Sequence, residues 1–109
     1  MFKLFQAPKI TLSPRQRQIL EELKKGTHVP QHLAQRATII LLAAYGQTNT
    51  KIARTIKVNR NTVKAWRKRW AASAQTLDRT EADRPRTLRA AIGAALEDAA
   101  ALESLLVKS

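Results

Sequence analysis

The most basic stretch of the chain spans residues 59–70 and reads NRNTVKAWRKRW. Five of its twelve residues are lysine or arginine, and none is acidic. Guanidinium and ammonium groups concentrated in this way bind polyanions through charge and hydrogen bonds. The same stretch holds both tryptophans of the protein. What it binds therefore depends on the elements that position the basic and the aromatic side chains.

The charge of the chain is unevenly distributed. The 109 residues carry a net charge of +12. Residues 1–77 contain 15 Lys and Arg but only Glu21 and Glu22 as acids, whereas residues 78–109 carry a net charge of −1. This asymmetry indicates that the first part of the chain binds a polyanion and the second part does not. The length suits one compact domain.

Several classes of protein are disfavoured by composition. The chain has no cysteine, which excludes disulfides and thiolate chemistry. Its most apolar run, residues 37–45, is far shorter than the roughly 20 residues that span a bilayer, and no convincing secretory signal precedes it. We therefore expect a cytoplasmic, nucleoid-associated protein without membrane contact. No group of side chains resembles an active site, so we expect no enzymatic activity, no cofactor and no small-molecule ligand.

Apolar spacing and capping residues predict an all-α fold. Ser13, Pro14 and Gln16 are typical of a helix start with a capping box, and Gly26 is a suitable helix end. Asn59 is a suitable cap for the helix that contains the basic stretch. The expected helices cover about residues 14–25, 31–45, 48 or 49 to 56, 60–74 and 87–107. We thus predict a helical bundle with this organisation: tail 1–10, DNA-binding domain 11–75, linker 76–86 and C-terminal helix 87–107.

The helix that begins near residue 60 separates its apolar and basic side chains. At about 100° per residue, Val63, Trp66 and Trp70 share one stripe, and the basic residues fall on a neighbouring one. We expect the tryptophans to be buried and to fix the orientation of the helix. The alternative is that both rings stack on the bases of a single-stranded nucleic acid.

The preceding helix makes the pattern that of a helix-turn-helix. The apolar positions that match are Ile52, Ala53, Ile56, Val58, Val63 and Trp66. Lys57 stands where the turn often has glycine, so we expect it to adopt a left-handed conformation at some energetic cost. In such a motif the second helix enters the major groove of duplex DNA and the first crosses the backbone. We therefore expect Arg60, Asn61 and Lys64 to contact bases, and phosphate contacts from Lys51, Arg54, Lys57, Arg67 and Lys68.

Several of these segments also resemble a known family. Leu12-Ser13 and residues 36–44, 51–54 and 61–70 are similar to the N-terminal DNA-binding region of bacterial insertion-sequence transposases of the mariner superfamily. The resemblance covers about residues 11–99. The catalytic half of these enzymes, in which two aspartates and a third acid bind magnesium, would lie beyond residue 109. The resemblance therefore implies recognition of a transposon end or an operator, without strand cleavage or transfer.

Other features leave two interpretations open. Arg84 and Arg86 are candidates for a minor-groove arm, or belong to a solvated linker. The apolar stripe from Leu88 to Leu106 is a candidate homodimer seam, or packs on its own domain. His28 and His32 lack further ligands for a metal site. The rival to duplex DNA as the partner is RNA or an acidic protein bound by the basic surface.

Overall fold

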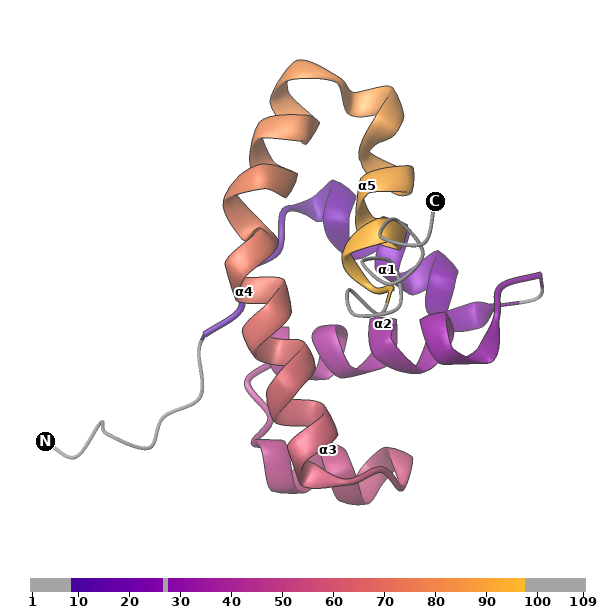
Figure 1. Ribbon diagram of the computed structural model, residues 1–109, viewed down its shortest axis with the longest axis vertical. Coiled ribbons are helices and arrows are strands. Elements are labelled where there is room, and N and C mark those ends of the chain that lie inside the picture. The colour runs from indigo at the N-terminus through magenta and orange to yellow at the C-terminus, as the bar shows by residue number, and fades with distance from the viewer. Residues whose placement is uncertain (1–8, 27, 98–109) are drawn as a thin grey trace, which may run out of the picture.

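The computed structural model describes residues 9–26 and 28–97, and these residues confirm the all-α fold. They contain no strand. Helix α4 is the longest element and runs along most of the molecule (Figure 1). No helix in these residues has both the length and the apolar character needed to cross a membrane. The elements in chain order are α1 (Pro14–Lys25), α2 (Gln31–Ala44), α3 (Asn49–Ile56), α4 (Arg60–Asp83), the 3₁₀ turn η1 (Pro85–Thr87) and α5 (Leu88–Ala95).

The capping residues predicted from sequence act as expected. The hydroxyl of Ser13 accepts a hydrogen bond from the backbone N–H of Gln16, and the Gln16 side chain accepts one from the N–H of Ser13. Gly26 ends α1 in the left-handed conformation with φ 50°. The side chain of Thr48 caps α3, and that of Asn59 caps α4. Local hydrogen bonds thus fix where these three helices begin.

One hydrophobic core unites the described helices, and both tryptophans belong to it. Trp66 is 6% exposed and Trp70 is 2% exposed, which confirms that α4 turns its aromatic side inward. Ile52 and Ala53 of α3 are buried, as the helix-turn-helix pattern predicts. Base stacking by the tryptophan rings is therefore not the arrangement found. The fully buried core side chains include Leu20, Ile39, Ile40, Leu41, Ile52, Val63, Trp70, Leu88, Ile92 and Leu96.

Three boundaries differ from the sequence prediction. The C-terminal helix predicted over residues 87–107 begins at Leu88, after a 3₁₀ turn, and α5 ends at Ala95, with Leu96 and Glu97 in a turn. Residues 76–83 were predicted to lie in a linker, but they form the last turns of α4. The helix continues because Leu77, only 2% exposed, follows Trp70 by seven residues and packs in the same core. Ile10, predicted to be in a tail, is also buried in this core.

Polar contacts between α1 and α4 add to the reason why α4 continues. The Nε2 of Gln16 donates to Oδ1 of Asp78 at 2.8 Å and to Oε1 of Glu81 at 3.2 Å. The hydroxyl of Ser13 donates to the same Glu81 oxygen at 2.7 Å. The two acids therefore receive hydrogen bonds from the start of α1, and the stretch that reads as a polar linker is a structural contact.

The candidate dimer seam packs within the chain wherever it is described. Leu88, Ile92 and Leu96 each have 0% exposure in the core of their own chain. The apolar stripe therefore follows the second interpretation as far as residue 96, and this part of it offers no surface to a second copy. Leu102 and Leu106, the later members of the stripe, lie outside the described residues. A homodimer through the C-terminal segment stays a prediction, and it would have to use the part of the stripe after residue 96.

The turn between α3 and α4 requires an unusual backbone conformation. Lys57 has φ 58° and ψ 50°, and it is the only non-glycine residue with positive φ among those described. The next residue, Val58, donates its N–H to the carbonyl of Ala53 at 3.0 Å. A side chain with a Cβ atom destabilises this left-handed conformation by roughly 1–2 kcal/mol. The turn thus retains a cationic side chain at some cost to stability.

Replacing Lys57 by glycine should stabilise the domain. We expect Lys57→Gly to raise the free energy of unfolding by about 0.5–1 kcal/mol, because relief of the left-handed strain exceeds the added entropy of the unfolded chain. Urea denaturation followed by circular dichroism measures this change. Lys68→Gly is the matched control and should destabilise by about 1 kcal/mol, since it places glycine inside a helix. Equal destabilisation by both variants would contradict the assigned turn conformation.

Candidate nucleic-acid interface

Helix α3 and the first turns of α4 lie together at one end of the molecule (Figure 1). Both helix starts are capped by a side chain: the Thr48 hydroxyl accepts from the N–H of Lys51 at 3.1 Å, and Oδ1 of Asn59 accepts from the N–H of Asn61 at 2.7 Å. Lys51, Arg60 and Asn61 in the first turns of the two helices are exposed. This end of the protein therefore presents two capped helix starts to a partner.

The three residues expected to contact bases share the exposed side of α4. Arg60, Asn61 and Lys64 are all exposed and lie in its first two turns. Arg60 and Lys64 are four residues apart, and Asn61 and Lys64 are three apart, so the three side chains neighbour one another on the helix surface. The structure therefore places two cations and one amide together at the start of α4.

Four of the five residues expected to contact phosphates are exposed on the same two helices and the turn between them. Lys51 and Arg54 lie on α3, Lys57 lies in the turn, and Lys68 follows Lys64 by one helical turn on α4. Neither α3 nor the part of α4 up to Leu77 contains an acidic residue. The exposed end of the molecule is thus uniformly positive, as a surface that meets a polyanion requires.

Arg67, the fifth expected phosphate contact, is buried instead. It is 6% exposed, and its Nη1 donates to the carbonyl oxygen of Gln47 at 2.9 Å and to Oδ1 of Asn49 at 3.1 Å. The helical spacing explains this placement, because Arg67 follows Val63 by four residues and precedes Trp70 by three. It therefore lies on the apolar stripe and not on the basic one, a signal that the sequence interpretation missed.

The contacts of Arg67 connect the start of α3 to α4. Gln47 precedes α3 and Asn49 is its first residue, so one guanidinium holds that segment against the middle of α4. Burial lowers the pKa of Arg67 from its ordinary value by desolvation of the guanidinium. The guanidinium nevertheless stays cationic at neutral pH, as arginine does throughout proteins. Arg67 therefore acts as a charged clamp between the two helices of the motif.

Two further arginines, which the sequence interpretation did not single out, flank Trp66. The guanidinium carbon of Arg36 lies 4.1 Å from the centroid of the Trp66 ring, and that of Arg69 lies 4.7 Å from it. Both distances are in the range of cation–π attraction. Arg69 follows Trp66 by three residues on α4, a spacing that could have revealed it, whereas Arg36 comes from α2 and has no local signal.

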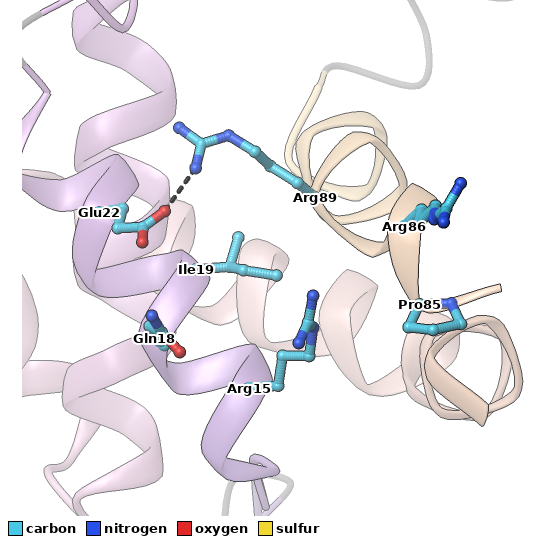
Figure 2. A pocket seen from close by; sticks show the side chains of 7 residues that line it. All are labelled: Arg15, Gln18, Ile19, Glu22, Pro85, Arg86 and Arg89. Carbon is cyan, nitrogen blue, oxygen red and sulfur yellow. Dashed lines mark hydrogen bonds and ion pairs between the residues drawn. The ribbon is translucent and has the colours of Figure 1, made fainter.

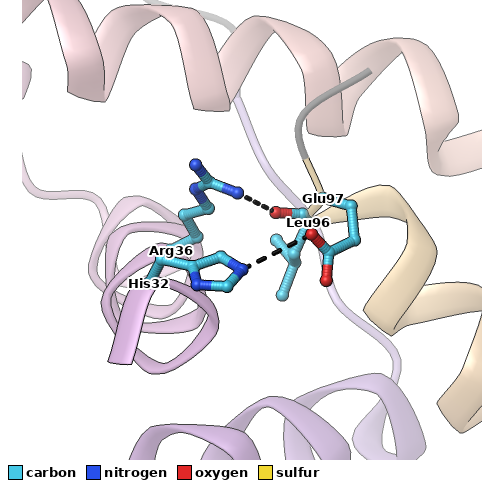
Figure 3. Close-up of polar contacts among 4 residues, drawn as sticks. All are labelled: His32, Arg36, Leu96 and Glu97. Atoms are coloured by element: carbon cyan, nitrogen blue, oxygen red, sulfur yellow. Dashed lines mark hydrogen bonds and ion pairs between the residues drawn. The ribbon is translucent and has the colours of Figure 1, made fainter. Parts of the chain in front are cut away.

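Arg36 also contacts the turn that follows α5 (Figure 3). Its Nη1 donates to the carbonyl oxygen of Leu96 at 2.7 Å. One turn earlier on α2, Nε2 of His32 lies 3.4 Å from Oε2 of Glu97. His32 thus faces a carboxylate of this turn. Within residues 9–26 and 28–97, no group of three or more histidines or acids could hold a metal ion.

Arg84 and Arg86 do not form an extended arm. The N–H of Arg84 donates to the carbonyl of Thr80 at 2.7 Å, and the carbonyl of Arg84 accepts from both the N–H and the hydroxyl of Thr87 at 2.9 Å. Pro85 begins a 3₁₀ turn that reverses the chain into α5. Both arginines are exposed, but they follow the last residue of α4, whereas Arg60 is its first. The predicted minor-groove arm is therefore a compact corner, remote from the basic end.

A substitution of Arg67 should show whether this residue holds α3 against α4 or contacts a phosphate. We expect Arg67→Met to reduce the free energy of unfolding by about 1.5–3 kcal/mol, because two partly buried acceptors lose a charged donor. The slope of log K against log salt for duplex binding should not change. Lys68→Met removes the same charge from the exposed side and should lower that slope by about one unit with little loss of stability. If the Arg67→Met protein is as stable as the parent and its salt slope is reduced, Arg67 contacts phosphate and is not a clamp.

Comparison with known proteins supports the motif assigned from this geometry. Residues 33–77 match the family model of homeodomain-like domains. This range contains most of α2, all of α3, the turn at Lys57 and α4 as far as Leu77. No curated protein and no solved structure gives a significant match to the chain. The described helices and the matching family model together show that the chain contains a homeodomain-like helix-turn-helix domain.

Proposed function

We propose that this protein binds duplex DNA at a preferred sequence, with α4 in the major groove and α3 across the backbone. The observation that carries the proposal is the exposed, acid-free basic end, mounted on an α4 whose opposite side is fixed by Trp66 and Trp70. A helix-turn-helix uses its second helix in this way. Burial of the tryptophans means that the basic side chains keep one orientation, which sequence readout requires.

The first turns of α4 would read the bases. Arginine pairs bidentately with guanine and asparagine with adenine in the major groove, and each good pair contributes about 1–3 kcal/mol of discrimination. Arg60 and Asn61 are exposed residues of these types in the first turn. Lys64, one turn later, can donate to a guanine edge. Three adjacent readers would cover only a few base pairs, so neighbouring contacts must set the register.

Phosphate contacts would provide most of the affinity and fix that register. The cations proposed for these contacts are exposed on α3, the turn and α4: Lys51, Arg54, Lys57 and Lys68. Each phosphate neutralised by a cation releases condensed counterions, so binding weakens as salt rises. The long-range field of the basic end would also accelerate encounter with DNA. These contacts position the protein but carry no direct sequence information.

The proposed biological role is recognition of a transposon end or an operator by a transposase-derived protein. It rests on the resemblance of residues 36–44, 51–54 and 61–70 to insertion-sequence transposases. We assign no strand cleavage or transfer to the described residues. Asp78 and Glu81 accept hydrogen bonds from the start of α1, and Glu97 faces His32, so these acids have structural partners. A DNA-binding role of this kind would place the protein at the nucleoid.

Selection of binding sites from a random duplex library tests the function directly. A single enriched motif, bound more tightly than random duplex at physiological salt, is the expected result. Equal binding of duplex DNA, RNA and an acidic polypeptide would contradict the proposal and favour a general polyanion-binding surface.

Alanine substitutions of the proposed readers should change base preference. We expect Arg60→Ala, Asn61→Ala and Lys64→Ala each to relax selection at one or two positions of the enriched motif and to weaken cognate binding by about 1–3 kcal/mol. Repeating the selection with each variant measures this effect. Lys68→Ala is the control, which should weaken cognate and random duplexes alike. If all three variants weaken binding to cognate and random duplexes equally, these residues do not contact bases.

Removal of single cations around the readers should change the salt dependence. For Lys51→Ala, Arg54→Ala, Lys57→Ala and Lys68→Ala, we expect the slope of log K against log salt to fall by about 0.9 each, with an unchanged base preference. Binding isotherms between low and physiological salt provide the slopes. Lys25→Ala, which removes one charge from α1, should leave the slope unaltered. Phosphate contact by these residues is refuted if their slopes equal that of the parent.

A further inference from the structure

A second charged surface lies away from the helix-turn-helix, between α1 and the start of α5 (Figure 2). It is a groove of about 290 Å³, sufficient for a few side chains of a partner and too small for a folded element. Buried Ile19 forms an apolar part of its lining. The side chains used in the argument are Arg15, Ile19 and Glu22 of α1, and Pro85, Arg86 and Arg89 of the corner and α5.

The charges of this groove are only partly balanced within the protein. Glu22 pairs with Arg89 across the groove, which neutralises one carboxylate and one guanidinium. Arg15 and Arg86 are exposed, and the side chain of neither has a hydrogen bond or ion pair with any residue of the described part of the chain. The groove therefore has two cations available to a ligand beside an apolar wall.

The groove is remote from the proposed DNA surface. Pro85 and Arg86 follow the last residue of α4, whereas Arg60 is the first. A helix of 24 residues is about 36 Å long. A duplex held by the first turns of α4 would leave the opposite end accessible (Figure 1). The two surfaces can therefore be occupied at the same time.

The composition of the groove favours an acidic peptide over a second nucleic acid. The one acidic residue that lines it, Glu22, is paired with Arg89. A phosphate backbone carries charge at every step and offers no aliphatic group to the apolar part of the lining. A short peptide can instead place its acids on the arginines and an aliphatic side chain on Ile19 and Pro85.

We propose that this groove docks an acidic segment of a partner protein while the helix-turn-helix holds DNA. Carboxylates of the segment pair with Arg15 and Arg86, since the planar guanidinium matches a carboxylate bidentately. An aliphatic residue between them covers the apolar wall. The protein would in this way link a DNA site to a second protein.

The test uses the full chain saturated with duplex DNA and a labelled peptide, Glu-Leu-Glu-Glu-Leu-Glu, with fluorescence anisotropy as the readout. The same peptide with glutamines in place of glutamates is the ligand control. We expect the acidic peptide to bind the DNA-loaded protein and the glutamine peptide not to bind. Displacement of the acidic peptide by duplex DNA would overturn the proposal, because the peptide would then occupy the helix-turn-helix.

Matched charge variants locate the site. Arg15→Gln/Arg86→Gln should weaken peptide binding at least about fivefold, as expected for the loss of two exposed ion pairs. Lys24→Gln/Lys25→Gln removes the same charge from α1 outside the groove and should change the affinity less than about twofold. Equal losses in both double variants would show attraction by net charge alone and overturn the proposal.

Duplex binding by the same variants separates this inference from the proposed function. Arg15→Gln/Arg86→Gln should leave DNA affinity and its salt slope unchanged, since both residues lie far from α3. A reduced slope in this variant would assign the groove to DNA and overturn the peptide proposal, while the helix-turn-helix assignment would stand. Amide shifts of Arg15, Ile19 and Arg86 on peptide addition, followed by NMR, are the expected positive result.

Discussion

Burial of Trp66 and Trp70 along one side of α4 determines which way the basic residues of that helix face. Loss of a buried tryptophan typically costs about 3–5 kcal/mol, more than any single exposed ion pair contributes. Rotation of α4 about its axis would expose both rings and bury lysines in their place. The apolar side of the helix therefore fixes the direction of the polar side, which is why the largest apolar residues lie inside the most basic stretch of the chain.

The same tryptophan ring connects parts of the chain that are distant in sequence. Arg36 of α2 stacks on Trp66 and donates to the carbonyl of Leu96 after α5. Arg67, one position after Trp66, fastens the start of α3. Two buried or half-buried arginines thus extend the influence of one helical turn to α2, α3 and the end of α5. Such residues are charged but act through packing and hydrogen bonds, so a count of basic residues overstates the surface available to DNA.

Features of the fold that depend on residues close together in the sequence could be predicted, whereas features that depend on distant residues could not. Ser13, Gly26 and Asn59 act on backbone groups within a few residues, and their caps were predicted correctly. The end of α4 could not be predicted in this way, because it depends on Leu77 and on hydrogen bonds from Ser13 and Gln16 that span more than 60 residues of sequence. At the candidate site, residue type and helical spacing correctly placed the exposed cations of α3 and α4. The placement of Arg67 was wrong, because its charge suggested the basic stripe whereas its spacing from Val63 and Trp70 puts it on the apolar one.

The sharing of α4 by both ends of the molecule has a consequence for cooperativity. Its stripe from Val63 to Leu77 packs in one core together with Leu88 and Ile92 of α5, so neither end can unfold without removing part of the support of the other. Amide hydrogens along the middle of α4 should therefore exchange with solvent only through opening of the whole domain. Helix α3 has fewer buried residues than α4, since only Ile52 and Ala53 of its eight residues are buried. We therefore expect α3 to open at a lower free energy than the middle of α4, so the helix proposed to cross the DNA backbone should adjust to the shape of the duplex more readily than the helix proposed to read its bases.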